Sequence, residues 1–110
     1  MIERTQFNRW TCPTQKTVEL IGDKWTLFII REFIFGKQTM RFNEILRKLK
    51  PISSRTLALK LDKLQKCEIL TREVLQKKPL QVHYKITRIG LELKDSMLAL
   101  ADWHNKYKLS

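Results

Sequence analysis

Residues 42–66 have the sequence FNEILRKLKPISSRTLALKLDKLQK, and this stretch decides the fold. Two segments with apolar residues at helical spacing flank a Lys50-Pro51-Ile52 turn, where proline cannot comfortably continue the preceding helix. Ser53 is a suitable N-cap for the second segment. The pattern predicts two short amphipathic helices, over residues 42–49 and 54–67, that form a helix-turn-helix. The predicted inward residues are Phe42, Ile45, Leu46 and Leu49 on the first helix, and Leu57, Leu61 and Leu64 on the second.

The outward face of the second helix follows from a rotation of about 100° per residue. Arg55 and Leu59 point most directly away from the inward leucines. Ser54, Arg55 and Thr56 lie near the start of the helix, where side chains of a recognition helix reach base edges. An exposed Leu59 is unusual on a merely solvated face, but it suits contact with a thymine methyl group.

The positive charge of the chain is concentrated around the same stretch. Residues 41–88 hold 13 of the 22 Lys and Arg residues but only 4 of the 11 Asp and Glu residues. With a pI near 10.0, this distribution predicts a polyanionic partner. Nucleic acid is the first candidate, an anionic membrane surface is the second, and a solvated lysine face is the alternative to both. The predicted DNA-contacting residues are Ser53, Ser54, Arg55, Thr56, Leu59, Lys60, Lys63, Arg41, Lys77 and Lys78.

The N-terminal part supplies the expected core. We expect residues 1–11 to form a flexible arm, followed by a helix over residues 14–21 that ends at Gly22. Asp23 is a plausible N-cap for a helix over residues 24–35, which is apolar on most sides and should be the central core helix. Gly36 is a natural stop for it.

The C-terminal part predicts a wing and a dimerisation helix. Residues 70–76 and 82–86 form two expected strands of a hairpin with lysines at its tip. Thr87 caps a final helix, expected over residues 87–108, with apolar residues on two faces. One apolar face can pack on the domain, and burial of the other against a second copy of the chain is the simplest explanation for it. The predicted dimer contacts are Leu91, Leu98 and Trp103.

Two cysteines, Cys12 and Cys67, are too few for a disulfide framework. Cys12 precedes Pro13 at a helix start, where the helix dipole favours a thiolate; a redox or electrophile sensor and an ordinary thiol both remain open. We interpret Cys67 as a small core residue. His83 and His104 lack neighbours at metal-ligand spacing, and the sequence contains no catalytic motif. We therefore expect no enzyme, metal or cofactor, and a cytoplasmic protein without a membrane segment.

The ordered motifs over residues 12–103 resemble the HxlR-type winged helix-turn-helix transcriptional regulators of bacteria, which have a MarR-like architecture. The matching pieces are Cys12-Pro13, Gly22, Lys24-Trp25-Thr26-Leu27, Arg31-Glu32, Gly36, residues 41–45, residues 52–57, Tyr84, Ile86-Thr87, Gly90 and residues 99–103. Asp23 stands where this family often has a second glycine.

The resemblance implies a homodimer built through the N- and C-terminal helices, with recognition helices in consecutive major grooves of a near-palindromic operator. It also implies wings on the flanking DNA. Several relatives sense oxidants, quinones or aldehydes through the cysteine that corresponds to Cys12.

The expected fold is thus a single domain over residues 1–110, mainly α with a small β-hairpin wing. The expected function is a sequence-specific transcriptional regulator of a bacterial promoter, a repressor, with Cys12 as a candidate sensor. The leading alternative is a nonspecific or RNA-binding winged-helix protein. A protein-docking module or an enzyme is a further alternative, since the fold alone does not prove DNA binding.

Overall fold

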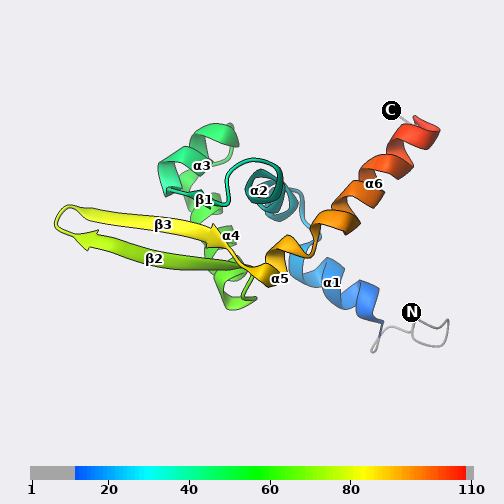
Figure 1. The fold of residues 1–110 in the computed structure, drawn as a ribbon. Helices are drawn as coiled ribbons and strands as arrows, with labels where there is room; N and C mark the ends of the chain where they lie inside the picture. Colours follow the sequence, from blue (N-terminus) through cyan, green and yellow to red (C-terminus); the bar gives the residue numbers. More distant parts are fainter. Residues whose placement is uncertain (1–11, 109–110) are drawn as a thin grey trace.

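Residues 12–108, the part of the chain that the structure describes, form six helices and a three-stranded antiparallel sheet in this computed structural model (Figure 1). The predicted arm over residues 1–11 lies outside the described residues. The elements are α1 (Pro13–Ile21), α2 (Lys24–Phe35), β1 (Thr39–Met40), α3 (Phe42–Lys48), α4 (Ser54–Lys66), β2 (Leu70–Lys77), β3 (Leu80–Ile86), α5 (Arg88–Leu91) and α6 (Lys94–Tyr107).

The core is built around α2, as its apolar sequence predicts. Ile29, Ile30 and Phe33 of α2 are completely buried. The three inward leucines of α4 are buried in the same cluster, so the predicted inward face of this helix is confirmed. No helix within residues 12–108 combines the length and the apolar character needed to cross a membrane.

The predicted wing is the β2–β3 hairpin, which extends from one side of the molecule (Figure 1). Leu70 and Ile86 pair where the hairpin meets the core, and both are buried. The strands continue well beyond that core, with a register irregularity between Val74 and Gln76. The sequence missed β1, whose two residues pair with Lys85 and Tyr84 near the C-terminal end of β3, because two residues are too few for an alternating pattern.

The prediction of one continuous final helix is wrong. The chain instead forms the short α5 and then α6, with Glu92 and Leu93 between them. Gly90 holds α5 close to the core, since a Cβ atom at this residue would lie 2.8 Å from the carbonyl oxygen of Ile69. The N–H of Leu93 donates to the carbonyl of Gly90 at 3.1 Å, a bond spanning three residues that tightens the chain there. Beyond this turn α6 leaves the domain on the side opposite the wing (Figure 1).

The break in the helix decides which apolar side chains reach the core. Leu91, Leu93 and Met97 are half-buried against the domain. Leu98 and Trp103 are exposed, and α6 contains no fully buried residue. Ile89, near the start of α5, is exposed as well, so Leu91, Leu93 and Met97 are the apolar residues of this segment that pack on the domain.

Candidate nucleic-acid interface

The start of α4 is held in shape by its own cap. The hydroxyl oxygen of Ser53 accepts a hydrogen bond from the N–H of Thr56 at 3.1 Å, and the same hydroxyl donates to the Thr56 hydroxyl at 2.9 Å. Ser53 and Thr56 are thus bound to each other at the helix start. Ser54 and Arg55 lie beside them with exposed side chains.

The outward face of α4 carries the residues that rotation about the helix axis predicts. Arg55 is exposed, and 63% of Leu59 is accessible although the residue is apolar. Further along this face, Lys66 forms an exposed ion pair with Asp62 at 2.9 Å. The face presents one arginine, an accessible leucine and small hydroxyl groups, which match the donors and apolar groups used on base edges.

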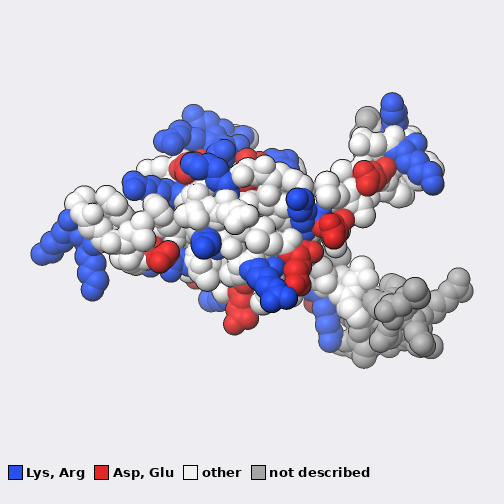
Figure 2. Space-filling view, viewed as in Figure 1, with Lys and Arg blue, Asp and Glu red and all other residues white. Residues whose placement is uncertain are grey.

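Positive charge also lies at the wing and on α3. Lys77 is the last residue of β2, Lys78 follows it, and both side chains are exposed. The side-chain amide of Gln76 donates a hydrogen bond to the Lys78 carbonyl at 2.8 Å. Figure 2 shows Lys and Arg at the end of the wing and over α3. Arg47, Lys48 and Lys50 at the end of α3 are exposed but were not among the predicted contacts, although they belong to the basic stretch.

A hollow of about 370 Å³ lies between the start of α3 and the wing. Arg41 and Arg72 both line it, together with the aromatic rings of Phe42 and Tyr84. The Nε of Arg41 donates to Nε2 of His83 at 3.2 Å, which ties the start of α3 to β3. Sequence reasoning missed Arg72; the strand register, which pairs Arg72 with Tyr84, reveals it.

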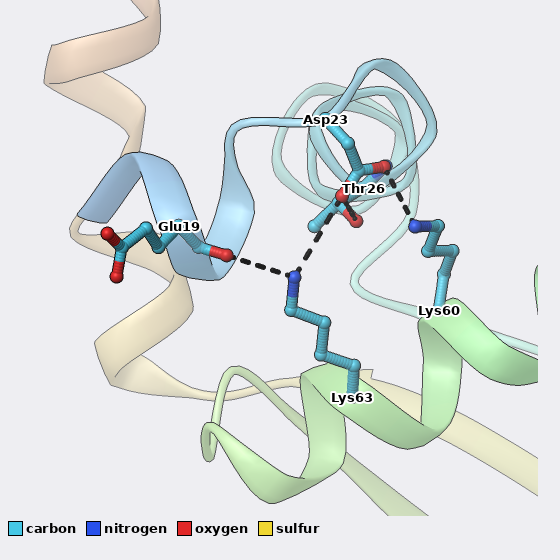
Figure 3. Close-up of polar contacts among 5 residues, drawn as sticks. All are labelled: Glu19, Asp23, Thr26, Lys60 and Lys63. Atoms are coloured by element: carbon cyan, nitrogen blue, oxygen red, sulfur yellow. Dashed lines mark hydrogen bonds and ion pairs between the residues drawn. The ribbon is translucent and has the colours of Figure 1, made fainter. Parts of the chain in front are cut away.

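Two of the predicted phosphate contacts have partners inside the protein (Figure 3). Lys60 forms an ion pair with Oδ1 of Asp23 at 3.3 Å. Lys63 lies 4.0 Å from Oδ2 of Asp23 and donates to the backbone carbonyl of Glu19 at 3.3 Å. Both lysines therefore reach from α4 toward the corner between α1 and α2.

Asp23 has a second task at this corner, as the predicted N-cap of α2. Oδ1 accepts from the N–H of Thr26 at 3.0 Å and Oδ2 from the Thr26 hydroxyl at 2.6 Å. Burial raises the pKa of Asp23, but the hydrogen bonds from Thr26 and the contact with Lys60 outweigh it and leave this pKa below its ordinary value. The carboxylate therefore stabilises the fold at neutral pH, and this contribution is lost as the pH falls through the lowered pKa.

Cys12 and Cys67 are both free thiols in different surroundings. Cys12 is the N-cap of α1, is 8% exposed, and its Sγ accepts from the N–H of Gln15 at 3.5 Å. Cys67 ends α4 and is half-buried against the core, as expected for a small core residue. Cys12 thus lies at the N-terminal, positive end of the α1 dipole.

An apolar surface lies on the side opposite the wing. A groove of about 180 Å³ runs between α1, α2 and α6, lined by Val18, Leu27, Met97 and Leu100 among others. Exposed apolar side chains continue from it onto both terminal helices. Of the predicted dimer contacts, Leu98 and Trp103 are exposed, whereas Leu91 packs on its own domain.

Comparison with known proteins identifies the same architecture. The model of the HxlR-like helix-turn-helix family matches residues 20–110. The uncharacterized HTH-type transcriptional regulator YdeP of Bacillus subtilis is 40% identical over 98 residues, which cover 88% of this chain and 74% of YdeP.

Solved structures agree with this sequence match. The redox regulator HypR in its reduced form superposes with a TM-score of 0.78 at 32% identity, covering 88% of this chain and 94% of HypR. The reduced transcriptional regulator YodB from B. subtilis superposes with a TM-score of 0.77 at 31% identity, covering 87% of this chain and 93% of YodB. The predicted winged-helix fold is confirmed.

The cap at the start of α4 gives the first testable prediction. Ser53→Ala removes the acceptor for the Thr56 N–H and should lower the free energy of unfolding by about 1 kcal/mol. Chemical denaturation at one fixed protein concentration measures this loss. Ser54→Ala is the matched control, because its exposed side chain caps nothing and its effect should stay within about 0.5 kcal/mol. Equal effects of the two substitutions would contradict the assignment of the cap.

Proposed function

Because this chain belongs to the HxlR-like helix-turn-helix family, a family of transcriptional regulators rather than of enzymes, we propose that it regulates transcription by binding duplex DNA sequence-specifically. The helix α4 enters the major groove, and the wing contacts the backbone beside it. The proposed outcome is repression of a bacterial promoter, and DNA as the partner implies a cytoplasmic location.

The observation that carries this proposal is the outward face of α4. Its core side is buried, so Arg55 and Leu59 are free to contact a ligand from the opposite side. Arginine donates two hydrogen bonds to the edge of a guanine, and leucine contacts a thymine methyl group. Ser54 and Thr56 add hydroxyl groups at the same end, while Lys77 and Lys78 provide phosphate contacts at the wing.

The second candidate function is nonspecific or RNA binding by the same surface. The exposed lysines and arginines of α3 and the wing favour it, since they would attract any polyanion. A structured RNA duplex does not admit a helix into its narrow major groove, so the use of an exposed helix face on α4 favours DNA. Competition among operator DNA, random duplex DNA and RNA separates the two functions.

We further propose that the protein is a homodimer through its terminal helices, on a near-palindromic operator. The 14-residue α6 buries no residue fully against its own chain, and an isolated helix of this length is marginal in water. A second copy that covers Leu98, Trp103 and the groove beside α1 would supply the missing contacts. Two recognition helices then match two half-sites about one helical turn apart.

Cys12 is the proposed sensor of oxidants or electrophiles. HypR, a redox regulator, shares the fold and about a third of the sequence. Modification of the Cys12 sulfur would remove the acceptor for the Gln15 N–H and so disturb the start of α1, one of the two helices proposed to pair in the dimer. A chemical change at Cys12 can thus alter the arrangement of the two subunits in the dimer through α1.

Arg55→Ala tests base recognition. The substitution should cost about 1–3 kcal/mol of binding to DNA from the protein's own promoter region and relax the choice of sequence at one position. Fluorescence anisotropy against operator and random duplexes, at several salt concentrations, measures both effects. Arg88→Ala, which removes the same charge from the exposed surface of α5, is the control and should change little.

Wild-type affinity for the operator should fall steeply with salt, with a slope of about −0.9 for each phosphate contact. A flat salt response would overturn DNA binding as the function. A loss on Arg55→Ala that is equal for operator and random DNA would reduce Arg55 to a phosphate contact.

Trp103→Glu and Leu98→Glu test the dimer. A carboxylate without a partner at an apolar interface is costly, so each substitution should shift the protein toward the monomer in sedimentation velocity at micromolar concentration. Asn105→Glu adds the same charge to the same helix at an exposed polar residue and should leave the dimer intact. A wild-type monomer at these concentrations would contradict the proposed assembly.

Cys12→Ser tests the sensor. A mild thiol oxidant or a quinone should change operator affinity in the wild type and in Cys67→Ser, but not in Cys12→Ser, because only Cys12 caps α1. Operator binding before and after treatment, with reductant added back, provides the measurement. If Cys12→Ser responds like the wild type, the switch lies elsewhere.

A further inference from the structure

A polar cluster connects α4 to the N-terminal helices, in addition to the buried leucines. We propose that Asp23, Lys60 and Lys63 form a positioning clamp that orients the recognition helix for specific binding. Lys60 and Lys63 then contribute to operator recognition by holding α4 in position, and they do not bind DNA phosphates. This inference rests on the proposed DNA-binding function and refines it.

The cluster joins three helices at one point (Figure 3). Asp23 caps α2, Glu19 contributes a carbonyl from the last turn of α1, and Lys60 and Lys63 come from α4. Within residues 12–108, these contacts are the hydrogen bonds and ion pairs that link α4 to α1 and to the α1–α2 corner.

Asp23 and Lys63 are each held in place by a further contact. The buried Thr26 bonds both carboxylate oxygens of Asp23, so the acceptor has a fixed orientation. The ammonium group of Lys63 lies at the C-terminal end of α1, where the helix dipole attracts a positive charge. Only 28% of the Lys60 side chain and 35% of the Lys63 side chain are accessible.

The two possible roles of these lysines predict effects of opposite sign. If Lys60 and Lys63 held phosphates, removal of the Asp23 charge would free them and strengthen binding to every duplex. If they orient α4, the same change loosens the helix and weakens binding to the operator alone. Asp23→Asn is suited to this comparison, because asparagine still caps α2 through its side-chain oxygen.

The experiment measures operator and random duplex affinities of Asp23→Asn, Lys60→Met and Lys63→Met across a salt series. The clamp predicts that each substitution lowers the ratio of operator to random affinity, by about tenfold for Asp23→Asn, as expected for residues coupled in one network. The salt slope should stay at its wild-type value. Asp95→Asn, the same change at an exposed residue of α6, is the control and should preserve the ratio.

Three results would overturn the clamp. The first is stronger binding of Asp23→Asn to both duplexes. The second is a salt slope that becomes shallower by about 0.9 for each lysine replaced, which identifies phosphate contacts. The third is a parallel loss on operator and random DNA, which would mean that the substitutions reduce only the folded fraction.

A measurement without DNA separates failure of the clamp from failure of the proposed function. Amide hydrogen exchange of Asp23→Asn should become faster both in α4 and in the last turn of α1, since the clamp joins them. Asp95→Asn should leave both regions unchanged. Wild-type exchange rates in Asp23→Asn refute the clamp whether or not the protein binds an operator, whereas a wild type without operator preference refutes only the DNA-binding function.

Discussion

The burial of Leu57, Leu61 and Leu64 against α2 is the constraint on which the rest of the structure depends. These leucines fix the rotation of α4 about its axis, and Arg55 and Leu59, on the opposite side of the helix, therefore face outward. The same packing places the hairpin beside α4, because β2 follows it within a few residues. The surface proposed to contact DNA is thus a consequence of how the core is filled.

The positive residues of α4 lie in two different surroundings. Arg55 is exposed and free to meet a base edge, whereas Lys60 and Lys63 are drawn to Asp23 at the α1–α2 corner. A count of positive residues treats all three alike. The presence of a nearby carboxylate separates a lysine that supports the helix from one that is available to phosphate.

The terminal helices connect the chemistry of Cys12 with the proposed dimer. Cys12 caps α1, while the other end of α1 meets Lys63 through the carbonyl of Glu19. The same helix borders the apolar groove next to α6. The short helix α1 therefore contacts the candidate sensor, the proposed dimer surface and α4. A structural change at one of these three places can shift the other two through α1.

The sequence by itself determined the helix-turn-helix, the central α2 and the hairpin, because apolar periodicity, Ser53, Asp23 and Pro51 are local features that need no partner to be recognised. Tertiary structure alone decided the break between α5 and α6, where Gly90 lies against the Ile69 carbonyl, and the pairing of β1 with β3. It also decided the direction of Lys60 and Lys63, since Asp23 is far away along the chain and only folding brings it within reach.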